Sequence, residues 1–150
     1  LVVDADMRRG RLHQVFGQAR GRGLSEAIAG QAPVGEAIRS TSHPGVSLLT
    51  AGAVPPNPAE LLGSERFQRL LAEVAARYDV VLVDTPPILA VTDGALVGRH
   101  AGVNLLVLRA AKRPPREISA ALRQLGRNGV RVNAIGPGPV LPSQRQALAA

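Results

Sequence analysis

A short apolar run near the middle of the chain constrains the fold more than any other feature. Residues 80–83 are all apolar, three of the four are β-branched, and Asp84-Thr85-Pro86-Pro87 follows directly. Branched side chains pack well on a pleated sheet, and an unbroken apolar run is typical of a strand covered on both faces in a parallel sheet. The run therefore predicts a buried strand that ends at Asp84, where open α/β sheets bind their ligands.

A second acidic group follows the apolar segment at the start of the chain. Residues 1–3 predict another buried strand, which leads to Asp4 and Asp6. If the two strands are neighbours, the carboxylates of Asp4, Asp6 and Asp84 meet at one edge of the sheet. Converging acids are unfavourable without a cation, and Mg²⁺ with nucleotide phosphates suits such oxygen ligands. A spare carboxylate would accept a proton from an attacking hydroxyl. The competing interpretation of Asp84 is a solvated residue that only ends a strand.

The rest of the chain alternates between helical and strand-like patterns. Helices are predicted over residues 12–16, 24–29, 34–38, 59–74, 94–97 and 118–125, and strands over 1–3, 46–49, 80–83, 103–108 and 130–135. The long helical stretch has an alternative, in which Gly63 ends one helix and Ser64 starts the next. This alternation predicts an α/β fold with a mostly parallel sheet, flanking helices and right-handed crossovers.

Composition excludes several classes of protein. The chain has 150 residues, enough for one domain, no cysteine for a disulfide or thiolate metal site, and no apolar run long enough to span a membrane. Aromatic residues make up 2%, which argues against a stacking platform for single strands and against sequence-specific RNA binding, but does not exclude contact with the DNA backbone. The net charge of +7 is the balance of seventeen arginines and one lysine, Lys112, against eleven Asp and Glu residues. It indicates an acidic partner such as nucleotide phosphates or an anionic surface, unless it is only a bias of composition.

Four stretches, taken in order, resemble the bacterial tyrosine kinases, or BY-kinases. The segment LVVDADMR at 1–8 resembles the Walker A′ motif, and GLSE at 23–26 resembles the segment after it. The proline-rich connector and helix start at 51–67, and DTPPILAVTD at 84–93, resemble the connector and the Walker B segment. The resemblance is to the autokinase domain of polysaccharide co-polymerases. It implies a P-loop NTPase-like fold of the Min/Par type, with residues 1–135 as part of the catalytic domain and 136–150 as a proline-rich or disordered tail.

The resemblance also implies roles for individual residues. Asp4 and Asp6 would be the Walker A′ acids near Mg²⁺ and the attacking tyrosine hydroxyl, and Asp84 the Walker B acid on the metal. All three would therefore be both catalytic residues and metal ligands. The expected contacts to the nucleotide are Arg8, Thr85 and Arg109.

What the family does is implied in the same way. Its members transfer the γ-phosphate of ATP to tyrosines in a tail of a neighbouring subunit, within a homo-oligomeric ring, and so regulate capsule or exopolysaccharide export. The domain would hang from a membrane-spanning co-polymerase region on the cytoplasmic side of the bacterial inner membrane. ATP and Mg²⁺ are the expected cofactors, and no nucleic acid is expected as a partner.

Two parts of the family pattern are absent from the sequence. It holds no Gly-rich loop with Lys-Ser/Thr, and Tyr78 is its only tyrosine, so the strand and P-loop before the Walker A′ strand and the tyrosine cluster are both missing. The opening directly in a strand suggests a piece of something longer. Two alternatives stay open: a Min/Par-type positioning ATPase, and a non-catalytic scaffold in polysaccharide export.

We expect the chain by itself to bind Mg-ATP weakly and to phosphorylate nothing. The Gly-rich loop supplies the backbone N–H groups and the lysine that hold the phosphates, and this sequence does not contain that loop. Isothermal titration calorimetry with Mg-ATP measures the affinity. A micromolar dissociation constant for the 150-residue chain would contradict the expectation.

Overall fold

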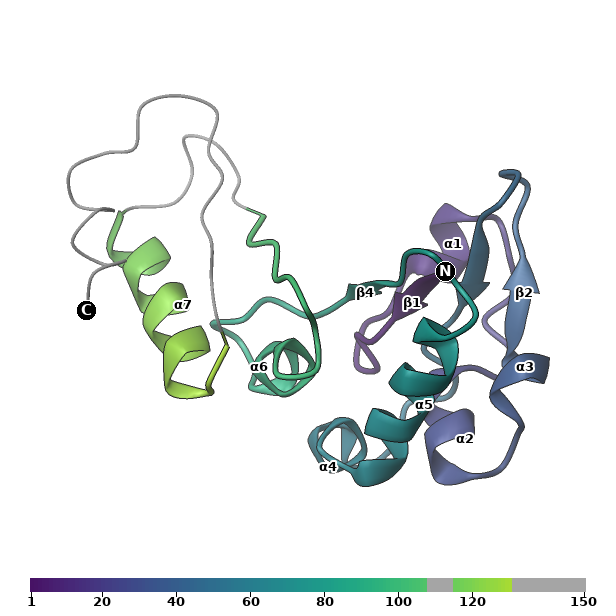
Figure 1. The fold of residues 1–150 in the computed structure, drawn as a ribbon, viewed down its shortest axis with the longest axis horizontal. Helices are drawn as coiled ribbons and strands as arrows, with labels where there is room; N and C mark the ends of the chain where they lie inside the picture. Colours follow the sequence, from purple (N-terminus) through teal and green to yellow (C-terminus); the bar gives the residue numbers. More distant parts are fainter. Residues whose placement is uncertain (108–114, 131–150) are drawn as a thin grey trace.

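The computed structural model describes residues 1–107 and 115–130, which form an α/β fold (Figure 1). The strands are β1 (Val2–Asp4), β2 (Ile38–Ser40), β3 (Ser47–Leu49) and β4 (Leu82–Asp84). The helices are α1 (Leu12–Val15), α2 (Leu24–Ala29), α3 (Val34–Ala37), α4 (Pro58–Leu62), α5 (Glu65–Ala75), α6 (Asp93–Gly98) and α7 (Pro115–Arg127). The α/β class with flanking helices is confirmed.

The sheet has the strand order β2-β3-β1-β4. Strand β1 runs parallel to both of its neighbours, β3 and β4, whereas β2 pairs with β3 in the antiparallel direction. The mostly parallel sheet is therefore confirmed. The predicted helix over 34–38 ends one residue early, because Ile38 has an extended backbone and pairs with Leu49 at the start of β2. No sequence pattern predicted β2.

The predicted helical stretch after the proline-rich connector is two helices. Helix α4 ends at Gly63, and α5 starts after Ser64, whose hydroxyl oxygen accepts a hydrogen bond from the Phe67 N–H at 3.3 Å. Serine at this position satisfies an amide that would otherwise have no partner, so it favours a new helix start. The alternative with a second helix starting at Ser64 is thus confirmed.

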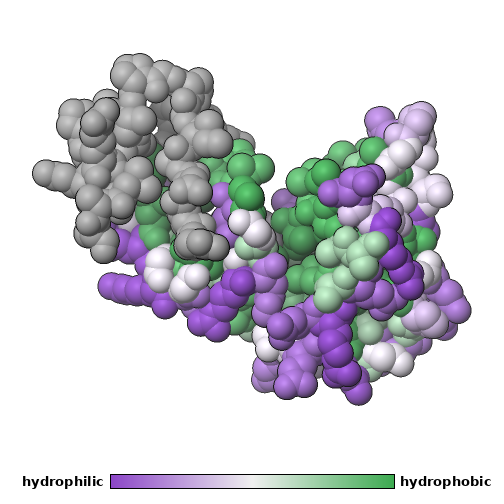
Figure 2. All heavy atoms as spheres, in the orientation of Figure 1, coloured by the Kyte–Doolittle hydropathy of each residue, from purple (hydrophilic) through white to green (hydrophobic). Residues whose placement is uncertain are grey.

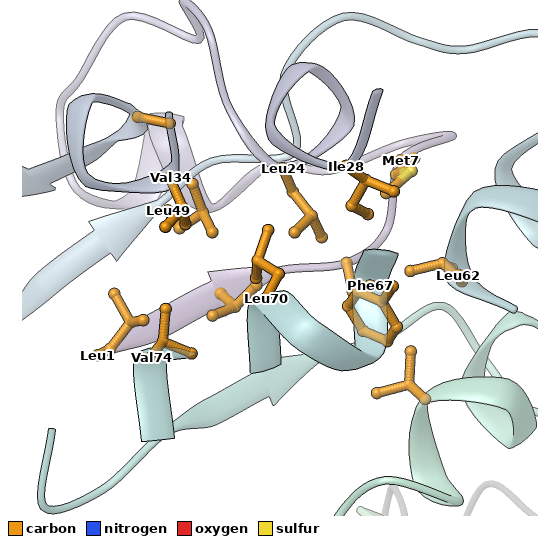
Figure 3. Close-up of a cluster of buried hydrophobic side chains, with 14 residues drawn as sticks. Leu1, Met7, Leu24, Ile28, Val34, Leu49, Leu62, Phe67, Leu70 and Val74 are labelled. Carbon is orange, nitrogen blue, oxygen red and sulfur yellow. The ribbon is translucent and has the colours of Figure 1, made fainter. Parts of the chain in front are cut away.

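The main hydrophobic core lies between the sheet and helices α2 and α5. Helix α5 buries Phe67, Leu70 and Val74, which recur at the spacing of one helical face. Figure 3 shows these side chains meeting others from β1, α2 and β3. The other labelled members of this cluster are Leu1, Met7, Leu24, Ile28, Val34, Leu49 and Leu62.

Strand β4 differs from its prediction, because only one of its faces is covered. Val81 and Val83 pack against the core, but Val80 is 61% exposed and Leu82 54% exposed. The strand also lies at the edge of the sheet, next to β1 alone, so its outer edge has no paired neighbour among the described strands. The prediction of a strand buried on both faces is therefore wrong for this chain.

The predicted strand over 103–108 is also not seen where the structure describes it. Residues 103–107 form no strand, and Val103, Leu105 and Val107 are each more than 70% exposed. No described strand lies beside them, so their alternate apolar side chains stay at the surface. Figure 2 shows apolar surface where the sheet faces the part of the chain that carries α6 and α7.

The last part of the described chain consists of two packed helices. Helix α6 packs against α4, and α7 packs against α6. Within α7, Ala121 and Leu125 are buried, and the predicted amphipathic helix is confirmed. Residues 131–135 of the last predicted strand and the predicted tail at 136–150 lie outside the described residues. Among the described helices, none is both long and apolar enough to cross a membrane.

The substitution Leu82→Lys tests whether the open face of β4 promotes self-association. A charged side chain on an edge strand opposes edge-to-edge pairing, and Leu82 has little packing to lose. We expect less self-association in sedimentation velocity, with the free energy of unfolding changed by less than about 0.5 kcal/mol.

The matched control is Leu49→Lys, at a fully buried position in β3. This variant should unfold, because the core would have to hold an unpaired ammonium group. Equal self-association of the wild-type chain and Leu82→Lys would contradict the role given to the open face.

Candidate functional site

Two acids lie side by side at the carboxyl ends of β1 and β4. The strands are parallel and in register, so that Asp4 pairs with Asp84 across the ladder. The amide N–H of Ala5 donates to the Asp84 carbonyl oxygen at 2.8 Å, which extends the ladder one residue beyond the strands. The two acids were expected to meet only if these strands are neighbours, and the structure confirms that they are.

Asp4 is fully buried and only half satisfied. Its Oδ2 accepts the Leu12 N–H at 3.0 Å, while Oδ1 is buried with no hydrogen-bond partner. Burial raises the pKa of Asp4, the charge of Asp84 raises it further, and the hydrogen bond from Leu12 opposes the shift. Gly10 closes over the carboxylate so tightly that a Cβ there would come within 2.7 Å of both oxygens. The site thus holds a carboxyl group whose charge is poorly compensated by the protein.

Asp84 and Asp6 complete the acidic group. Asp84 keeps an open side to solvent, yet partial desolvation raises its pKa, and the nearby charge of Asp6 adds to the rise. The Oδ1 atom of Asp6 accepts two backbone hydrogen bonds, from the N–H of Arg8 at 3.2 Å and of Arg9 at 2.9 Å. Asp6 is therefore fixed by the tight turn that follows β1, close enough for its charge to act on both other acids.

The three acids do not form a ready-made metal cage. In the part of the chain that the structure describes, no group of three or more His, Cys, Asp or Glu is placed to hold a metal ion. Mg²⁺ is commonly bound by one or two carboxylates together with water and phosphate oxygens. The unpartnered Oδ1 of Asp4 and the mutual repulsion with Asp84 suit a cation of this kind. The site fits Mg²⁺ held by these two carboxylates, with Asp6 beside them.

The predicted nucleotide contacts are placed differently from one another. Arg8 forms an ion pair with Asp93, with 3.0 Å between Nε and Oδ2 and 3.4 Å between Nη2 and Oδ1. Thr85 is half-buried directly after Asp84, and Arg109 lies outside the described residues. Sequence reasoning missed this ion pair, because Arg8 and Asp93 are 85 residues apart.

Two arginines stabilise the loop before α2. Arg39 donates to the carbonyl oxygens of Ala19, Arg20 and Arg22, and the Arg20 Nε donates to the carbonyl of Gly52. Part of the positive charge is therefore engaged in the architecture of the loop before α2. This finding favours a structural role for these arginines over contact with an acidic partner.

The chain was compared with known proteins. It is 45% identical over 135 residues to the tyrosine-protein kinase wzc of Salmonella typhimurium, a match that covers 90% of this chain and 19% of that protein. The solved kinase domain of the Escherichia coli tyrosine kinase ETK matches with a TM-score of 0.84 and 38% identity, over 92% of this chain and 59% of that structure. The BceF tyrosine kinase domain matches with a TM-score of 0.77 and 46% identity, over 86% and 51%.

These matches have a definite extent. The chain spans about a fifth of the length of the curated relatives it matches. No protein-family model matches the chain.

The substitution Asp4→Asn should stabilise the fold at neutral pH. In the folded chain the pKa of Asp4 is raised, so its ionised form opposes folding above the ordinary pKa of 3.8, and this penalty is absent where both states are protonated. Asparagine keeps an oxygen for the Leu12 N–H and has no charge to bury. We expect a gain of about 1 kcal/mol in the free energy of unfolding at pH 7, which disappears as the pH falls below 3.8.

Denaturant unfolding of both chains at several pH values between 3 and 7 checks this sign. A loss of stability at pH 7 in Asp4→Asn would show that the ionised carboxylate stabilises the apo fold, contrary to the burial seen here.

Proposed function

We propose that this chain forms the Walker A′ and Walker B part of an ATP-dependent protein-tyrosine autokinase. The premise is that the chain is a homologue of the bacterial tyrosine kinases and has the fold of their kinase domain. The single observation that carries the proposal is the register of β1 and β4, which aligns Asp4 with Asp84. A sheet edge with two such acids suits a metal bound to nucleotide phosphates.

The proposed roles follow from the environment of each carboxylate. Asp84, which is open to solvent, would hold Mg²⁺ directly or through water, and the unpartnered Oδ1 of Asp4 would hold it from the buried side. Bound Mg²⁺ would neutralise the developing charge on the transferred phosphoryl group. Asp6, fixed by the turn after β1, would keep the site negative beside the attacking tyrosine hydroxyl. Their raised pKa values would make Asp4 and Asp84 better proton acceptors than ordinary aspartates.

Thr85 and Arg8 stay proposed contacts to the nucleotide. Thr85 follows the metal-facing Asp84 directly and is partly open to solvent. Arg8 has a half-exposed side chain, although its guanidinium is held by Asp93. Arg109 is proposed on the resemblance alone.

The wider setting is proposed from the likeness to bacterial tyrosine kinases. In the whole protein the phosphate acceptors would be tyrosines in a tail of a neighbouring subunit, within a homo-oligomeric ring. The domain would lie on the cytoplasmic side of the inner membrane, attached to the membrane-spanning region of a polysaccharide co-polymerase. Its activity would regulate the export of capsule or exopolysaccharide.

A chimera provides the test, because the solved ETK kinase domain extends beyond the region that this chain matches. The matching part of that domain is replaced by residues 1–135 of this chain, and phosphotyrosine is measured by mass spectrometry after incubation with Mg-ATP. We expect autophosphorylation, lowered on the order of 100-fold by Asp84→Asn because a metal ligand is lost.

The matched control is Asp79→Asn, at an exposed aspartate in the turn before β4. It should leave autophosphorylation unchanged. A folded chimera that hydrolyses ATP without forming phosphotyrosine would favour a Min/Par-type ATPase. A folded chimera that does neither would favour a non-catalytic scaffold, and both results would contradict the proposal.

A further inference from the structure

The strongest feature that the proposed function leaves unused is the ion pair between Arg8 and Asp93. The side chain of Asp93 is 0% exposed and that of Arg8 is 42% exposed. Each carboxylate oxygen of Asp93 accepts a hydrogen bond from one guanidinium nitrogen of Arg8. A buried carboxylate without such a partner is strongly unfavourable, so this pair should be made in most folded molecules.

Arg8 also belongs to the turn that orients Asp6. Its backbone N–H donates to Oδ1 of Asp6, next to the parallel bond from Arg9. Two residues later, Gly10 packs against the carboxylate of Asp4 and the carbonyl of Asp6. A movement of Arg8 would therefore disturb the hydrogen bonds of Asp6 and shift Gly10, which covers the carboxylate of Asp4.

Asp93 belongs to a second segment of the site, which runs from Asp84 to the start of α6. The segment from Asp84 to Asp93 begins in the ladder with β1 and ends at the first residue of α6. The first turn of α6 packs on the turn after Asp84, since a Cβ on Gly94 would lie 3.2 Å from the Thr85 hydroxyl oxygen. The turn after β1 and the segment 84–93 are therefore joined twice, by the ladder between β1 and β4 and by the ion pair between Arg8 and Asp93.

We infer that Asp93 is a positioning residue, which acts through Arg8 to hold the acidic turn over residues 6–10 against the end of β4. Asp93 is buried, and both of its carboxylate oxygens are engaged by Arg8. Its contribution is to fix where the carboxylate of Asp6 lies relative to Asp4 and Asp84. This inference deepens the proposed function and rests on it only for the effect on catalysis.

The first test needs no nucleotide and uses the whole 150-residue chain. Hydrogen exchange of single amides is measured by NMR in the wild-type chain and in Asp93→Asn, which keeps the size of the side chain but removes its charge. We expect exchange at Arg8 and Arg9 to rise about tenfold or more, while amides of the core around Phe67 keep their protection.

Two further variants keep the test decisive. Arg8→Lys retains the charge but loses the two-pronged contact, so it should loosen the same turn to a smaller degree. If Asp93→Asn does not fold, Arg8→Lys takes its place in the measurement. Arg9→Gln is the matched control, at an exposed arginine in the same turn whose side chain has no part in the pair. Its neighbours should keep wild-type exchange.

The second test adds Asp93→Asn to the chimera described above. We expect kcat for autophosphorylation to fall about tenfold or more, because the acids are misplaced. KM for Mg-ATP is measured as well, because Arg8 is a proposed nucleotide contact and the acids are proposed metal ligands.

The outcomes separate the two proposals. Unchanged exchange at Arg8 and Arg9, or an equal rise throughout the core, would overturn the positioning role whatever the chimera does. A local rise in exchange supports it, even where an inactive wild-type chimera shows that the proposed kinase function is wrong. With an active chimera, a local rise in exchange and an unchanged kcat would also overturn it.

Discussion

The structure depends above all on the parallel pairing of β1 with β4. Each strand is only three residues long, so the pair owes its stability to its neighbours as much as to its own hydrogen bonds. The core beneath it, centred on Phe67 and Val74 of α5, holds both strands by their inward-facing residues. Figure 1 shows β1 and β4 side by side, and their register pairs Asp4 with Asp84.

The same pairing creates the electrostatic tension of the site. Burial and the charge of Asp84 on the adjacent strand raise the pKa of Asp4, and only hydrogen bonds from the backbone of Leu12 and Asp6 oppose this rise. A fold optimised only for stability would not keep such a pair. The arrangement makes sense where a cation and phosphate oxygens complete the set, as the likeness to kinase domains suggests. On the proposed function, stability is given up at the position where the metal would bind.

Sequence patterns predicted the two neighbouring strand ends that carry Asp4 and Asp84 better than they predicted the surroundings. The apolar runs before Asp4 and Asp84 were enough to predict two parallel strands with acids at their ends, because only a parallel arrangement aligns both carboxyl ends. The exposure of Leu82 was not predictable, since a run of four apolar residues does not say which strand lies at the edge. Strand β2 was missed because Ile38-Arg39-Ser40 is too short to show a period. The pair of Arg8 with Asp93 joins residues far apart in sequence, and no local pattern contains that information.

One measurement tests the central claim most directly: the scalar coupling transmitted through hydrogen bonds, recorded by NMR on the chain in solution. The account predicts a coupling between the Ala5 amide nitrogen and the Asp84 carbonyl carbon, and a second one between Leu82 and Leu1, because the N···O distances are 2.8 Å and 2.9 Å. Assigned spectra in which both couplings are absent, with the Ala5 amide exchanging freely with water, would show that the two strands do not pair and that the acids do not share a site.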